Sequence, residues 1–269
     1  MMVETRLRTA TLAALAAALM IGMGAAPALA DNDKVPPGDP CGDGPGQGTG
    51  NPCNGNNGND GEQGNAGGGD GGGGTDPFEP ITLPSAEDRG VFITQVGDTN
   101  RADVRQASGN SYARVAQNGA ENRTLLTQGA GGRHYAVVAQ DGDNNAVDGG
   151  QDGTGQTVLL LAQQGDGNTA IIRQSDDGVA YSAAAVQQSG NGNQLLLLQD
   201  GSDNQARLTQ DGDDNAMTAT QLNSGNRLEW SQTGDGLADL GITQTGNGNL
   251  QVTQSTSGVQ FMPAPGSGG

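Results

Sequence analysis

The residues with the most regular spacing in this sequence are amides. From about residue 91 onward a glutamine recurs, mostly every 11 residues, and an asparagine often follows five residues later. Buried amides are costly unless each donor and acceptor is paired, and identical amides stacked in register can pair as the Asn/Gln ladders of cross-β structures. The predicted ladder residues are Gln95, Gln106, Gln117, Gln128, Gln140, Gln151, Gln163, Gln174, Gln188, Gln199, Gln210, Gln221, Gln232, Gln244 and Gln254, with Asn100, Asn122, Asn145, Asn168, Asn193, Asn204, Asn215, Asn226 and Asn249.

Glycines at a second fixed offset mark the turns that separate these units. Two residues after most of the glutamines comes a glycine, and both Gly and Asn tolerate the positive φ angles that tight turns require. The turn glycines are Gly97, Gly119, Gly142, Gly165, Gly190, Gly201 and Gly212, with further examples at Gly153, Gly234 and Gly246.

The residues between one turn and the next glutamine alternate with period two, which is typical of a β-strand. Counting back from each glutamine, the second and fourth positions are apolar or small, as in Val115 and Ala113 before Gln117. Charged strand residues such as Arg114 occupy odd offsets. One strand face is therefore expected to be dry and the other wet, with the glutamine, and the asparagine six residues before it, on the dry face.

One strand and one turn cannot bury a dry face alone, so the units must stack. In the first half of the repeats, complete Gly/Asn turns alternate with degenerate ones, which indicates two edges with different requirements. We therefore predict an all-β fold, a β-solenoid of strand-turn-strand rungs. Each rung takes about 22 residues and the repeats make seven or eight rungs, preceded by a disordered Gly-rich segment.

Composition divides the chain into four segments. Residues 1–30 carry arginines, an apolar run and a small-x-small cleavage pattern, as in a signal peptide, so we expect the protein to be secreted and not stably inserted in a membrane. Residues 31–88 are rich in Gly, Asn and Asp and are expected to form a disordered tether. The solenoid is predicted over residues 89–256, and residues 257–269 are expected to be a flexible C-terminal tail.

The charge and the cysteines exclude some functions and leave others open. The formal net charge of -18 argues against binding to a nucleic-acid backbone. Cys41 and Cys53 both lie in the tether, where a local disulfide is the leading interpretation and a bond between chains is the alternative. Zinc is a weaker interpretation, because two thiols without a neighbouring histidine do not complete a tetrahedral site.

The ends of the predicted solenoid suggest its function. The first and last rungs would present unpaired backbone groups, and no capping segment is visible in the sequence, since only a short tail follows Gln254. An end that matches its own opposite end makes a heterologous contact that does not close, and such contacts build filaments. The expected principal partner is therefore another copy of the same chain, joined head to tail.

The repeat also resembles the curlin family of fibre subunits. Its pattern, Ser-x5-Gln-x-Gly-x2-Asn-x-Ala-x3-Gln, is met by Ser111, Gln117, Gly119, Asn122 and Gln128, with Thr124 in place of Ala. The resemblance covers about residues 89–256. It implies a subunit of bacterial functional-amyloid fibres of the curli type that mediate adhesion, aggregation and biofilm formation. Such subunits are exported through an outer-membrane pore and nucleated by a homologue, and the sequence leaves open whether this chain is a major or a nucleating subunit.

Two other classes of function have weaker support. A monomeric calcium-binding β-roll or adhesin solenoid is the first alternative, because Gly71-Gly72-Gly73-Gly74-Thr75-Asp76 matches one β-roll unit, but that unit is not in tandem. An enzyme is the second. No phosphate-binding loop or nucleophile motif stands out, and the single histidine, His134, lies in a turn region where we expect it to be exposed. We therefore predict no catalytic residues, no metal site and no cofactor.

Overall fold

The computed structural model describes residues 78, 80–82 and 89–263, and within these ranges every regular element is a β-strand. The strands run in the order β1 (Gly90–Val96), β2 (Arg101–Gln106), β3 (Tyr112–Asn118), β4 (Arg123–Gln128), β5 (Arg133–Asp141), β6 (Ala146–Asp152), β7 (Gln156–Gln164), β8 (Thr169–Ser175), β9 (Tyr181–Ser189), β10 (Gln194–Asp200), β11 (Gln205–Asp211), β12 (Ala216–Leu222), β13 (Arg227–Thr233), β14 (Ile242–Thr245), β15 (Asn249–Ser255) and β16 (Gly258–Pro263).

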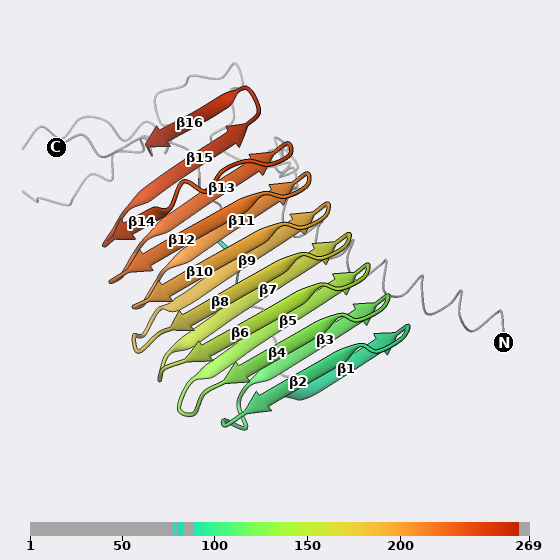
Figure 1. Ribbon diagram of the computed structural model, residues 1–269. Helices are drawn as coiled ribbons and strands as arrows, with labels where there is room; N and C mark the ends of the chain where they lie inside the picture. Colours follow the sequence, from blue (N-terminus) through green and yellow to red (C-terminus); the bar gives the residue numbers. More distant parts are fainter. Residues whose placement is uncertain (1–77, 79, 83–88, 264–269) are drawn as a thin grey trace, which may run out of the picture. The chain divides into compact units, whose positions relative to one another are not determined.

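The strands form two sheets in which every strand from β1 to β15 pairs with the strand two places along the chain, and β16 pairs with β15 (Figure 1). Sheet A contains the odd-numbered strands and β16, and sheet B contains the even-numbered strands from β2 to β14. All pairs except β15 with β16 are parallel, and equivalent glutamines face one another, as Gln117 faces both Gln95 and Gln140. The predicted β-solenoid is therefore confirmed, and its seven-stranded sheet B gives seven complete rungs.

The core lies between the two sheets and follows the predicted parity. Side chains two and four residues before most of the glutamines form one continuous apolar cluster, which runs from Ala113 and Val115 to Val252 and includes the fully buried Trp230. Because each rung contributes only a few aliphatic side chains, no single rung could bury this cluster by itself. The hydrophobic contribution to stability therefore depends on stacking.

The turns form two edges of the solenoid. At the first edge each sheet A strand passes into the following sheet B strand, and at the second edge the chain returns to sheet A. Gly142, at the first edge, has a φ of 120°, and a Cβ added to it would meet the carbonyl oxygen of Gly165 at 2.2 Å. Glycine is required there both for its backbone conformation and for the close approach of the next rung.

The C-terminal end of sheet A differs from the prediction. Residues 257–269 were expected to form a flexible tail, but β16 within this segment folds back and pairs antiparallel with β15 (Figure 1). The expectation that no segment covers either end is therefore wrong for this end of sheet A. At the other end, β1 and β2 are the outermost strands of their sheets.

The outer face of sheet A also differs from the expected wet surface. Over β7 and β9 it carries Val158, Ala183 and Ala185, which pack with Ile81 in a second apolar cluster. Ile81 is further held by two hydrogen bonds, from its amide to Gln205 Oε1 at 2.9 Å and from the Tyr181 hydroxyl to its carbonyl oxygen at 2.7 Å. The segment expected to be a tether therefore contacts the solenoid at the residues that the structure describes, and the rest of 31–88 lies outside them.

Candidate functional site

The predicted glutamines of sheet A form one unbroken chain of amide hydrogen bonds. Each Nε2 donates to Oε1 of the glutamine in the next rung toward the C-terminus, over donor-acceptor distances of 2.6 to 3.0 Å. The participants, in order, are Gln95, Gln117, Gln140, Gln163, Gln188, Gln210, Gln232 and Gln254.

Sheet B carries a second ladder with the same polarity. Its distances run from 2.7 to 3.1 Å. The participants are Gln106, Gln128, Gln151, Gln174, Gln199, Gln221 and Gln244. The inner members of both ladders are buried, which gives the predicted dry-face position of the glutamines a direct hydrogen-bonding role.

From Gln106 to Gln244, each ladder glutamine also donates to a backbone carbonyl of the opposite sheet. Gln163, for example, donates to Gln188 Oε1 at 2.8 Å along the ladder and to the Ala146 carbonyl of sheet B at 3.3 Å, while its own Oε1 accepts from Gln140. In sheet B, Gln174 likewise reaches the Val158 carbonyl of sheet A at 3.0 Å. The ladders thus satisfy buried donors along the solenoid axis and across the core at once.

The asparagines form a third ladder at the first edge. The Asn122 amide nitrogen donates to Asn100 Oδ1 at 3.0 Å, and Asn122 Nδ2 donates to the Gly142 carbonyl of the next rung at 2.6 Å. This pattern of backbone donor to side-chain oxygen repeats from rung to rung through Asn145, Asn168, Asn193 and Asn215. Leu237 ends the ladder, since its amide donates to Asn215 Oδ1 at 2.9 Å.

The second edge uses several residue types at the equivalent position, six residues before a glutamine. The occupants from rung to rung are Ser111, His134, Thr157, Ser182, Asn204 and Asn226. Several neighbouring members are linked: the His134 amide donates to Ser111 Oγ at 3.3 Å, and the Asn204 amide donates to Ser182 Oγ at 3.2 Å. This is the degenerate edge that the sequence indicated, and the short hydroxyl side chains explain why its pattern is harder to see.

The expected exposure of His134 is wrong. Its side chain has no solvent-exposed area, its Nδ1 lies 2.9 Å from Thr157 Oγ1, and its Nε2 is buried without a hydrogen-bond partner. Burial lowers the pKa of His134 below 6.5, and the charges of Asp152 and Asp176 oppose this shift. Counting six residues back from Gln140 would have placed His134 on the dry face.

The prediction that Asn249 belongs to the buried ladder is also wrong. The interval from Gln244 to Gln254 is one residue shorter than usual, so the residue six before Gln254 is Gly248. The amide of Gly248 donates to Asn226 Oδ1 at 3.3 Å, and Asn249 begins β15 opposite Arg227. Strand register is therefore set by the glutamine that follows a turn and not by the one that precedes it.

The two ends of the glutamine ladders are chemically different. At the N-terminal end, Oε1 of Gln95 and Oε1 of Gln106 accept no hydrogen bond from any residue that the structure describes. At the C-terminal end, Gln244 Nε2 turns to the carbonyls of Arg227 and Gly248, and Gln254 Nε2 donates to the Ala238 carbonyl. One end thus presents open acceptors, and at the other end each terminal Nε2 already donates at least one hydrogen bond within the chain.

Carboxylates stack on the surface of the first edge. Each side-chain oxygen accepts from a backbone amide of the preceding rung, as Asp143 Oδ1 does from Ala120 at 2.6 Å and Asp166 Oδ1 from Asp143 at 2.7 Å. In residues 78, 80–82 and 89–263, no group of three or more His, Cys, Asp or Glu side chains is arranged to hold a metal ion. The same ranges contain no helix long and apolar enough to cross a membrane.

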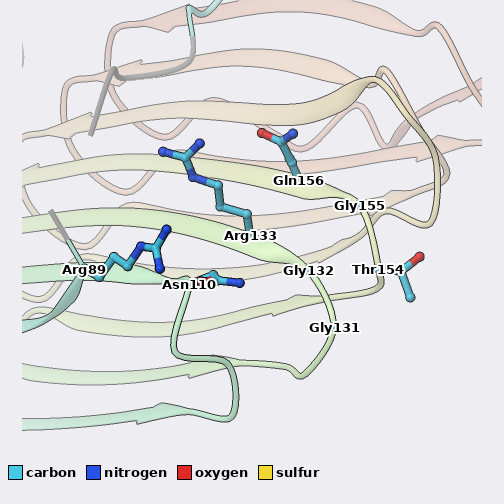
Figure 2. Close-up of a pocket in the computed structure, with 8 residues that line it drawn as sticks. All are labelled: Arg89, Asn110, Gly131, Gly132, Arg133, Thr154, Gly155 and Gln156. Carbon is cyan, nitrogen blue, oxygen red and sulfur yellow. The ribbon is translucent and has the colours of Figure 1, made fainter. Parts of the chain in front are cut away.

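An open groove runs along the second edge (Figure 2). Its lining contains no carboxylate, imidazole or thiol side chain. The lining residues are Arg89, Asn110, Gly131, Gly132, Arg133, Thr154, Gly155 and Gln156.

The comparisons with known proteins gave no relative. No protein-family model matches this chain, and neither a curated protein nor a solved structure resembles it significantly.

Proposed function

We propose that this protein is a secreted structural subunit that polymerises end to end into extracellular amyloid-like fibres. The observation that carries the proposal is the pair of glutamine ladders, which run unbroken through the solenoid and are open at the N-terminal end. Each ladder is polar, because every amide donates toward the C-terminus. A second copy can therefore extend both ladders only when its C-terminal end meets the open acceptors.

The geometry of such a contact favours a filament. The N-terminal end presents Gln95 and Gln106 on strands that already pair in parallel register with the next rung. Opposite ends of one chain are different surfaces, so contact between them is heterologous, and a stack along one axis does not close. The resulting polymer would continue the cross-β spacing of about 4.8 Å between rungs.

The curlin resemblance supports the same proposal and adds a biological setting. By that resemblance the fibre would lie at a bacterial cell surface and serve adhesion and the biofilm matrix, and the subunit would be exported through an outer-membrane pore. A nucleating homologue would be a further partner, and this chain would be either the major subunit or that nucleator. No catalytic or cofactor role enters the proposal.

The test is assembly of the purified chain from residue 31 onward. We expect dye-binding filaments, fibre diffraction at about 4.8 and about 10 Å, and faster conversion of fresh monomer when preformed filaments are added. A folded protein that remains a single soluble particle after long incubation at high concentration would disprove the proposal.

A matched pair of variants tests whether the N-terminal end is the contact. Ile93 lies on the inner face of β1 and is 46% exposed, because no rung covers it. Ile93→Lys places an inward-pointing charge on this edge, a device that blocks edge-to-edge pairing. We expect filament growth to stop or slow at least tenfold, while Thr94→Lys, on the exposed outer face of the same strand, leaves the growth rate nearly unchanged.

The antiparallel strand β16 favours a second candidate function, a monomeric adhesin solenoid. Covering a sheet edge is a common way for natural proteins to prevent polymerisation. The same incubation separates the two candidates, because a capped adhesin stays monomeric.

A further inference from the structure

The C-terminal end of sheet A is covered by a strand that does not belong to the repeat. β16 contains none of the ladder glutamines and runs antiparallel to β15, with Gln254 facing Val259 and Val252 facing Phe261. It lies at the end of the stack opposite β1 and β2 (Figure 1). The backbone edge of β15, which would otherwise remain unpaired, is thereby occupied.

β16 is held by its backbone far more than by its side chains. Val259, Phe261 and Met262 are 41%, 57% and 46% exposed, whereas Val252 in the neighbouring β15 is 1% exposed. Each backbone hydrogen bond contributes a net of only about 1 kcal/mol, and little apolar burial is added to it. A strand held in this way opens at a low free-energy cost compared with a strand of the core.

The strand beneath β16 has the features of a standard rung. β15 pairs in parallel register with β13 along its whole length, and Gln254 accepts the ladder hydrogen bond of Gln232 at 3.0 Å. Among the residues that the structure describes, Gln254 Nε2 donates only to the Ala238 carbonyl, which leaves the second of its two amide hydrogens for a further acceptor. β1 of a second copy presents such an acceptor, Oε1 of Gln95.

We propose that β14 and β15 form the surface that binds β1 and β2 of a second copy, and that β16 occupies the β15 edge until that copy displaces it. This inference rests on the proposed function. It adds that β16 acts as a gate, a strand that must leave the β15 edge before a second copy can bind there. Displacement exchanges an antiparallel strand with exposed side chains for parallel strands that extend both sheets and both glutamine ladders. On sheet B, the Gln244 amide would leave the Gly248 carbonyl, 3.2 Å away, for Gln106 of the incoming copy.

Truncation provides the first test. Removal of residues 258–269 from the full chain deletes β16, and the control, removal of residues 264–269, leaves β16 intact. We expect the first variant to assemble with a lag at least threefold shorter than that of the full chain, and the control to keep the lag of the full chain. Equal lags for all three proteins would overturn the inference.

A reversible lock provides a second test that does not depend on how the truncated chain folds. Thr253 and Gln260 face each other across β15 and β16, and both are exposed. In a Cys41→Ser, Cys53→Ser parent, we introduce Thr253→Cys with Gln260→Cys. Oxidation should lengthen the lag at least threefold, and reduction should restore the lag of the parent. The parent alone should show no effect of oxidation.

The outcomes separate the gate from the proposed function. If the full chain and the parent form filaments but neither truncation nor locking changes the lag, the gate is refuted and the fibre remains. If locking shortens the lag, β16 promotes assembly and the gate is again refuted. If no variant, including the one without β16, forms filaments, the proposed function fails and the gate fails with it.

Discussion

At the residue scale, the unusual feature is a core in which polar amides are as regular as the aliphatic side chains. Gln163 is 1% exposed, yet both of its amide hydrogens and its oxygen are bonded. An amide in this position costs little desolvation, because the neighbouring rungs supply identical partners at the right distance. Each rung therefore needs a glutamine at this position, because the glutamines of the two neighbouring rungs depend on it for their hydrogen bonds.

Replacing a central ladder glutamine should be strongly destabilising. In Gln163→Leu, the Ala146 carbonyl, Gln188 Oε1 and Gln140 Nε2 each lose a partner inside the core. At roughly 1–3 kcal/mol for each unsatisfied group, we expect the free energy of unfolding to fall by about 3 kcal/mol or more. Denaturant unfolding of monomer measures this change. The control is Gln164→Leu, at a half-buried neighbouring position, and an equal loss in both variants would refute the ladder's role.

His134, at the second edge of the solenoid, makes the stability of the fold sensitive to pH. Since burial lowers its pKa in the folded protein, the unfolded chain binds a proton more readily, and stability falls as the pH drops through and below 6.5. The neighbouring rungs hold Ser111 and Thr157 at this position, and neither titrates in this range.

The variant His134→Asn tests this effect, because Asn occupies the equivalent position in later rungs at Asn204 and Asn226. We expect the unfolding midpoint of the wild type to fall more between pH 7.5 and pH 5 than that of the variant. Above pH 7 the midpoints of the two proteins should change with pH in the same way. Identical pH profiles would show that His134 is not the titrating group.

At the scale of elements, the turns are as constrained as the strands. The first-edge glycines stack so closely that the space for a Cβ is taken by the carbonyl of the following rung, as at Gly119 and Gly142. This explains why glycine recurs two residues after so many glutamines. The sequence suggested a reason based on φ alone, and the stacking adds a steric reason.

Gly142→Ala should therefore lose more stability than a turn substitution normally does. The new Cβ would strain a φ of 120° and approach the Gly165 carbonyl oxygen at 2.2 Å. We expect a loss of about 3 kcal/mol in the free energy of unfolding. Gly109→Ala is the matched control, since no atom lies within 4 Å of its added Cβ, and it should change stability by less than about 0.5 kcal/mol.

At the scale of the whole molecule, charge opposes the stacking of copies. The formal net charge is -18, and exposed carboxylates such as Asp143 and Asp166 follow one another along the first edge. Each added copy extends this row, so like charges accumulate along the axis of a polymer, although added salt screens them.

Assembly should consequently respond to salt and pH. We expect a shorter lag at 0.5 M than at 0.02 M sodium chloride at neutral pH, and a shorter lag at mildly acidic than at neutral pH. Seeded and unseeded dye-binding kinetics measure both effects. Lag times that ignore both variables would contradict a role for this charge.

The sequence predicts those features of the fold that are determined by residues close together in the chain. The strand faces, the turn glycines and the rung length follow from spacing, because period two and a recurring Gly or Asn are local requirements of strands and turns. Asn249 and His134 were misplaced because the register follows the glutamine after each turn. Asn249 was assigned by counting forward from Gln244, across an interval of ten residues, and His134 was not counted back from Gln140; the count back from the following glutamine gives both positions correctly.

The sequence alone determined that the chain must stack amide and aliphatic side chains in an all-β solenoid, because only stacking satisfies both in units this small. Only the tertiary structure decided how the stack is covered. The docking of Ile81 on the outer face of sheet A and the pairing of β16 with β15 join segments with no repeat signal of their own. Their positions depend on which surface and which backbone edge the folded rungs leave exposed, and these exist only after folding.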